Sequence, residues 1–174
     1  MQTKLWFERR FAFDLPVWMY PNVVERLRGT PARAEDLIQG VPSEVLTRRP
    51  GEGWSMQENI GHLLDLEPIW AGRVDDIVGG KLRLRDADLT NRKTHEAHHN
   101  ARPIGDILKA FRAVRLQLVH RLDTLDDTFA GRTATHPRLE QPMRLLDLMF
   151  FVAEHDDHHL ARMTRLKRLF TLPA

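Results

Sequence analysis

The sequence predicts an all-α protein, a four-helix bundle. Apolar residues recur at the three- and four-residue spacing of an α-helix over four long stretches, and the alternating β-branched runs typical of strands are few. The chain has 174 residues and is 42% hydrophobic, which is enough for one buried core. We therefore expect a single helical-bundle domain over residues 1–174, most simply with antiparallel helices.

The first predicted helix covers residues 21–39. Thr30 and Pro31 lie inside it, and we expect a break or kink there because proline lacks the backbone N–H that a helix interior uses. Gly40 and Pro42 predict the end of this helix.

The second predicted helix has the clearest start. Ser55 and Glu58 have the spacing of a capping box, in which each side chain binds the backbone N–H of the other residue. Apolar residues follow at helical spacing until Gly79 and Gly80 end the helix. The polar segment 81–102 predicts a long loop, in which a short helical turn could form. A loop of this length could also allow a non-sequential arrangement of the helices.

Two further helices are expected in the second half of the chain. Pro103 opens the third, which runs to about Leu122. A loop over residues 127–141 follows, and we expect no strands in it. Pro142 opens the fourth helix, which runs to about Leu169.

Composition excludes several classes of protein. The chain has no cysteine, so disulfides, thiolate metal sites and a cysteine nucleophile are excluded. The 26 basic and 24 acidic residues are interspersed and give a net charge of +2, unlike the segregated basic face of a nucleic-acid binder. Basic residues near the end of the chain are explained by a helix C-terminus, where cations interact favourably with the helix dipole. They are Arg162, Arg165, Lys167 and Arg168. With no secretory pattern and no run of about 18 apolar residues, we expect a soluble cytoplasmic protein without a membrane or nucleic-acid partner.

Two histidines interrupt the apolar face of the fourth helix. On a helical wheel the apolar stripe runs through His155 and His159, whereas His158 falls toward solvent. Buried imidazoles need polar partners, and two of them one turn apart can bind the same ion. Neutral imidazole suits zinc, nickel and other first-row metals. We interpret the pair as a metal site, with satisfied core histidines as the alternative.

A third ligand should come from another helix. His62, at the shoulder of the apolar face of the second helix, is the candidate, although spacing alone leaves the other histidines open. Three histidines would leave a position open for water, as in reactive zinc sites. A competing pattern, His95 to His99, matches the H-E-x-x-H signature of zinc proteases but has no apolar helix face behind it. We favour a solvated loop there, near the mouth of the site.

Several segments resemble the DinB/YfiT-like superfamily of metal-binding four-helix bundles. They are residues 53–58, 61–65 and 154–160, with residues 25–31 and the pair His136-Pro137 also fitting the pattern. The resemblance covers nearly the whole chain. Its most specific part is one histidine after a W-S-x-x-E start and an H-x-x-x-H pair near the C-terminus.

The resemblance implies a divalent metal, often zinc or nickel, held by His62, His155 and His159. The superfamily includes S-transferases and isomerases that use low-molecular-weight thiols, and its members are often homodimers. Members commonly carry glutamine three residues after the last histidine, where this chain has Arg162. This departure weakens any transfer of substrate specificity but not of the histidine triad.

Three carboxylates, Asp65, Asp156 and Glu58, are candidates for accepting a proton near the metal or orienting a ligand. Glu58 is better explained by the capping box, and no residue is assigned as catalytic. Four aromatic residues could line a pocket, although packing in the core or at the bundle end is the favoured interpretation: Trp54, Trp70, Phe150 and Phe151.

Two functions follow from these observations. The first is a metal-dependent enzyme acting on a small molecule, either a thiol-dependent S-transferase or a hydrolase. The alternative is a non-catalytic metal-binding or stress-response protein with a structural metal. A sealed structural site would need a fourth protein ligand, and none is compelling, so the enzyme is favoured.

Overall fold

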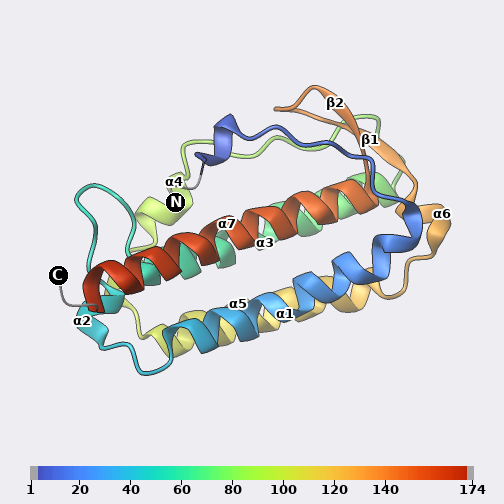
Figure 1. Cartoon of the computed structure of the whole chain (residues 1–174). Coiled ribbons are helices and arrows are strands. Elements are labelled where there is room, and N and C mark those ends of the chain that lie inside the picture. Colours follow the sequence, from blue (N-terminus) through green and yellow to red (C-terminus); the bar gives the residue numbers. More distant parts are fainter. Residues whose placement is uncertain (1–3, 172–174) are drawn as a thin grey trace.

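The computed structural model describes residues 4–171. Four long helices form the bundle in Figure 1: α1 (Tyr20–Ile38), α3 (Met56–Val78), α5 (Ile104–Leu122) and α7 (Leu145–Thr171). The shorter elements are η1 (Trp6–Glu8), η2 (Val17–Met19), α2 (Ser43–Leu46), α4 (Arg92–Glu96), η3 (His99–Ala101), α6 (Asp127–Ala130), β1 (Thr133–His136) and β2 (Gln141–Arg144). None of the helices described is long and apolar enough to cross a membrane.

The long helices do not simply alternate in direction. α3 and α5 run the same way and pack against each other, as do α1 and α7 (Figure 1). α1 also packs against α5, and α3 against α7, so helices that follow one another in the chain are not always neighbours. The simple antiparallel order is therefore wrong. The long segment between α3 and α5 explains this, because it returns along the bundle before α5 begins (Figure 1).

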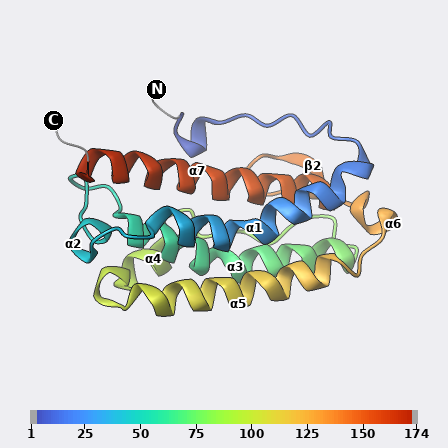
Figure 2. The same ribbon diagram turned by 60° about the horizontal axis from the view of Figure 1, so that its bottom comes forward.

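Three irregular segments lie along the same side of the bundle, next to α7. They are the N-terminal segment 4–19, the chain that leads from α3 to α4, and the β1–β2 hairpin (Figures 1 and 2). Because these segments cover α3 and α7, side chains on that side of the two helices are enclosed although they face away from α1 and α5.

α1 continues through Pro31 as one helix, so the chain does not break there. Proline at this position leaves the carbonyl of Leu27, four residues earlier, without its helical donor. Arg115 Nη1 of α5 donates a hydrogen bond to this carbonyl at 3.4 Å. The tertiary contact replaces the missing backbone bond, which explains why the helix tolerates the proline.

The start of α3 confirms the predicted capping box. The Ser55 hydroxyl accepts a hydrogen bond from the backbone N–H of Glu58 at 3.1 Å. The Glu58 carboxylate in turn accepts one from the backbone N–H of Ser55 at 2.9 Å. Glu58 is also paired with Arg49, so its role is to fix the N-terminus of α3.

The connection before α7 contains strands, contrary to the expectation from the sequence. β1 and β2 pair antiparallel, with Ala134 opposite Met143. Pro142 lies in β2, and α7 begins at Leu145 rather than at Pro142. Asp147 determines this start, because its carboxylate accepts a hydrogen bond from the backbone N–H of Arg144 at 2.9 Å.

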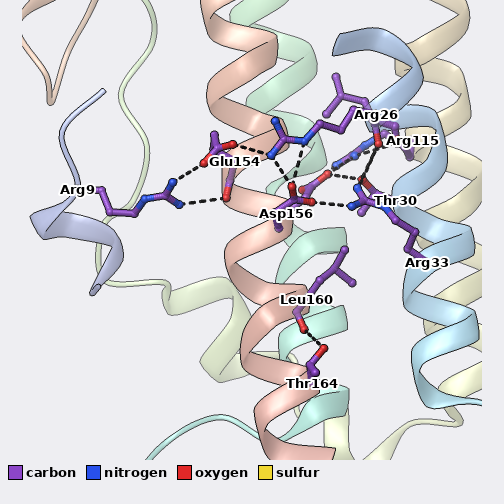
Figure 3. Close-up of polar contacts among 11 residues, drawn as sticks. Arg9, Arg26, Thr30, Arg33, Arg115, Glu154, Asp156, Leu160 and Thr164 are labelled. Carbon is purple, nitrogen blue, oxygen red and sulfur yellow. Dashed lines mark hydrogen bonds and ion pairs between the residues drawn. The ribbon is translucent and has the colours of Figure 1, made fainter. Parts of the chain in front are cut away.

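The apolar core consists of two clusters, one toward each end of the bundle. Between them lies a buried polar layer with one residue from each long helix: Thr30, Glu67, Arg115 and Asp156. Arg115 binds Glu67 at 2.5 Å. Arg115 also binds Asp156 at 2.5 Å, and the Thr30 hydroxyl donates to Asp156 at 2.9 Å (Figure 3). This layer fixes the relative positions of all four helices in the middle of the bundle.

Candidate metal centre

The structure brings the three predicted histidines together. His62 of α3 and His155 and His159 of α7 are all buried, and one ring nitrogen of each lies within 4.8 Å of the others. Nε2 of His62 is 3.4 Å from Nε2 of His155. The helical spacing of the H-x-x-x-H pair and the packing of α3 on α7 produce this arrangement.

Two neighbouring side chains orient the imidazoles. His159 Nδ1 donates a hydrogen bond to Asn59 Oδ1 at 2.8 Å, so the lone pair of a neutral His159 is on Nε2. The Asn59 amide is itself fixed, because its NH₂ group donates to the Ser55 carbonyl at 2.7 Å. His62 Nδ1 is 3.0 Å from the hydroxyl of Thr94. Both contacts leave the Nε2 atoms free to face the centre of the triad.

The environment keeps the triad uncharged. Burial lowers the pKa of His62 to about 3, and it lowers the pKa values of His155 and His159 well below the ordinary value. Mutual repulsion between the imidazoles acts in the same direction. Neutral imidazole nitrogens that converge in a buried space are the form and the arrangement that a divalent cation requires, so the residues present fit such an ion.

None of the three candidate carboxylates is in direct contact with the triad. Asp156 binds Arg115 and Thr30 in the polar layer, and Glu58 caps α3. Asp65 accepts a hydrogen bond from His99 Nε2 at 2.8 Å. Burial raises the pKa of Asp65, but hydrogen bonds from His99 and Thr94 outweigh this effect and lower it. Asp65 is thus the partner of His99 and does not contact the triad directly.

The H-E-x-x-H segment does not form a protease-type site. α4 ends at Glu96 and His98 has a positive φ of 48°, so His95 and His99 do not lie on one helix. His99 is buried, contrary to the expected solvated loop. Its ring lies directly over Gly61 of α3, where a Cβ atom would overlap it. His95 lines the pocket described next, and His98 is exposed.

The triad opens into a pocket of about 450 Å³. Trp6, Trp54, Trp70 and Phe151 line it together with the three histidines. Trp70 and Phe151 also belong to the buried core, as expected, so they form the boundary between the core and the pocket. The Trp54 ring is centred 4.6 Å from that of His62, and the Trp6 ring 5.0 Å from that of His155. Phe150 instead packs against the core.

Several pocket residues were missed or misplaced by sequence reasoning. His158 was expected to face solvent, but it is buried beneath the N-terminal segment, with its ring centred 5.8 Å from that of Trp6. Arg73, His136 and Arg138 also line the pocket. The family resemblance includes the pair His136-Pro137 but does not indicate that His136 lines the pocket, and no local pattern marks Arg73 or Arg138, which come from α3 and from the unpredicted hairpin. Asn59 could have been found, since it precedes His62 by three residues on the same helix.

Comparison with known proteins identifies the family and a similar fold. The family model of the DinB superfamily matches residues 26–163. The fold is similar to that of YfiT from Bacillus subtilis, with a TM-score of 0.80, 19% sequence identity and coverage of 95% of each chain. That protein is described as a probable metal-dependent hydrolase with an unusual four-helix bundle topology. No curated protein matches the sequence significantly. The family match, which spans most of the bundle, shows that the chain belongs to the DinB superfamily.

Proposed function

We propose that the protein is a metal-dependent hydrolase of small molecules, with zinc or nickel held by His62, His155 and His159. The observation that carries this proposal is the opening of a three-nitrogen cluster into a pocket of about 450 Å³. Among the described residues, the cluster contains no fourth histidine or carboxylate that would close the coordination sphere. A structural site would be closed, whereas a catalytic site keeps a position open to substrate or water.

A divalent cation bound here would supply a Lewis acid that lowers the pKa of water or of a thiol. The protein's own groups prepare the site for this chemistry. Asn59 and Thr94 hold His159 and His62 in the orientation that the ion needs. The rings of Trp6, Trp54 and Trp70 line the space beside the histidines and restrict water there. The pocket volume suits a small substrate, which supports a small-molecule reaction over one on a macromolecule.

The proposal is tested first by metal content. Tag-free protein should contain about one equivalent of zinc or nickel by elemental mass spectrometry. His155→Ala and His159→Ala should abolish binding, whereas His98→Ala, at an exposed position outside the cluster, should retain it. Equal metal content in the three variants would refute the site assignment.

Turnover is tested on the metal-loaded protein with a panel of esters and amides, and with a low-molecular-weight thiol plus an electrophile. The hydrolase is supported if a chelator abolishes hydrolysis and added metal restores it. Thiol conjugation without hydrolysis would favour the S-transferase instead. Metal binding without either reaction, with unfolding on chelation, would favour the structural-metal alternative.

A further inference from the structure

A second polar cluster lies in the wall of the same pocket, outside the histidine triad. Arg73 comes from α3, His136 ends β1, and Arg138 lies in the turn between β1 and β2. Arg73 and His136 are each only 2% exposed. Arg73 Nη1 lies 3.0 Å from His136 Nε2.

Two hydrogen-bond donors face each other in this cluster. His136 Nδ1 accepts the backbone N–H groups of Arg138 and Leu139, each at 3.2 Å, so the proton of the neutral ring is on Nε2. A guanidinium has only donors. Two donors, Arg73 Nη1–H and His136 Nε2–H, therefore face each other, and a negatively charged acceptor is the partner that both lack.

The two arginines also have no carboxylate partner. Among residues 4–171, no aspartate or glutamate lies within ion-pair distance of Arg73 or Arg138. The buried Nη2 of Arg138 has no hydrogen-bond partner at all. Buried Arg115, in contrast, binds two carboxylates. Arg73 Nε donates a hydrogen bond to the Arg85 carbonyl at 3.2 Å, but this neutral acceptor does not compensate the charge. A buried guanidinium without a counter-charge is costly, so the site is incomplete without an anion.

The acidic residues of the pocket do not satisfy the arginines. Glu52, Asp86 and Asp88 line it but are exposed, and Asp88 is used by the backbone N–H groups of Thr90 and Arg92. Burial lowers the pKa of Arg73 to about 10, although the charge of exposed Asp86 acts in the opposite direction. Arg73 remains protonated at neutral pH, so the cluster stays cationic.

We propose that Arg73, His136 and Arg138 bind an anionic group of the substrate, a carboxylate or a phosphate. Planar guanidinium groups suit both of these anions. An anion here would accept hydrogen bonds from Arg73 Nη1 and His136 Nε2 and would pair with the free end of Arg138. The assignment of the anion to a substrate rests on the proposed hydrolase function. The anion site itself does not depend on that function.

The position of the cluster fits an anchor for a substrate that reacts at the triad. The Arg73 guanidinium lies 5.6 Å from the centre of the Trp70 ring, and that ring is centred 5.7 Å from His155. On the other side, the Phe151 ring is centred 5.2 Å from His136. About one aromatic ring separates the cluster from the triad, so a short substrate could hold its anion at one end and its reacting bond at the other.

The test is calorimetric titration of metal-free protein with inorganic phosphate and, separately, with glutarate. At least one probe should bind, and Arg138→Gln should weaken that binding by about tenfold or more, since a charge-assisted contact is lost. Arg92→Gln, at an exposed arginine beside the pocket, is the matched control and should keep the affinity within about twofold. The stronger probe identifies the anion as phosphate or carboxylate. Absence of binding by both probes, or equal affinity in wild type and Arg138→Gln, would overturn the proposal.

A second measurement separates this inference from the hydrolase proposal. On metal-loaded protein, the KM for the mononitrophenyl ester of glutarate should rise in Arg138→Gln, while the KM for neutral nitrophenyl butyrate should not. Metal content should equal that of wild type. Anion binding without hydrolysis would leave the anion site standing and reject the hydrolase. Hydrolysis of both esters, with no effect of Arg138→Gln on either KM, would support the hydrolase and reject the anion site.

Discussion

Asn59 Oδ1 accepts a hydrogen bond from His159 Nδ1 at 2.8 Å, which links the first turns of α3 to the middle of α7 beside the triad. The contact decides which nitrogen of His159 can bind an ion. It is buried on both sides, since Asn59 and His159 are 0% and 4% exposed. The capping box that starts α3 therefore also positions Asn59, which lies four residues after Ser55.

Asn59→Ala should lower metal affinity by about 10- to 100-fold without removing a ligand, because the orienting acceptor is lost. Competition between the protein and a chelator with a metal-sensitive dye measures this affinity. Asn59→Asp, which retains an acceptor oxygen at the same position, is the matched variant and should bind metal more tightly than Asn59→Ala. An Asn59→Ala protein with wild-type affinity would show that the hydrogen bond does not prepare the site.

Arg115→Met should destabilise the bundle by about 3–5 kcal/mol, because it leaves Glu67 and Asp156 buried without their partner. The change also removes the donor to the Leu27 carbonyl that Pro31 leaves free. Urea unfolding gives the free energy directly. Arg121→Met breaks a half-exposed ion pair with Asp75 and should cost less than about 1 kcal/mol. Similar losses in the two variants would mean that the polar layer has no special role.

Gly61→Ala should destabilise the protein by about 1–3 kcal/mol, because the added methyl group would overlap the His99 ring. His99 would have to move, and its hydrogen bond to Asp65 would weaken. Gly29→Ala in α1 is the matched control, since no atom lies within 4 Å of the new methyl group. That change should stabilise α1 by about 0.5–1 kcal/mol through helix propensity. Thermal unfolding of the two variants should therefore shift in opposite directions.

Local patterns predicted the parts of the site that lie on single helices. The spacing of Ser55 and Glu58 indicated where α3 begins, and the apolar stripe through His155 and His159 indicated which imidazoles face inward. His62 needed the family resemblance, because a shoulder position can face either the core or the solvent. Periodicity gives the face of a helix but not which segment of the chain will cover it.

Long-range packing explains what the sequence analysis missed. His158 is off the apolar stripe, yet the N-terminal segment buries it through Trp6. The four-residue strands β1 and β2 are too short for an alternation pattern, and the anion cluster depends on the hairpin that they form. The direction of α5 depends on the length and path of the segment before it, which composition does not encode.

His136→Gln should make the stability of the metal-free protein less sensitive to acid. Burial lowers the pKa of His136 to about 3 in the folded chain, below the ordinary value of 6.5. Below pH 6.5 the unfolded chain takes up a proton that the folded chain excludes. The contribution of His136 is therefore fully present above that pH and is lost as the pH falls toward 3. Between pH 7 and pH 5 this loss amounts to about 2 kcal/mol.

Urea unfolding at pH 7, 6 and 5 measures this effect as the difference in slope between wild type and His136→Gln. The other buried histidines also resist protonation, so the variant should retain part of the acid sensitivity. The number of protons taken up on unfolding in acid should be about one lower than in wild type. His120→Gln, at an exposed position, should follow the wild-type curve. Parallel curves for wild type and His136→Gln would mean that His136 takes up its proton in the folded protein at the same pH as in the unfolded chain, which would contradict the prediction.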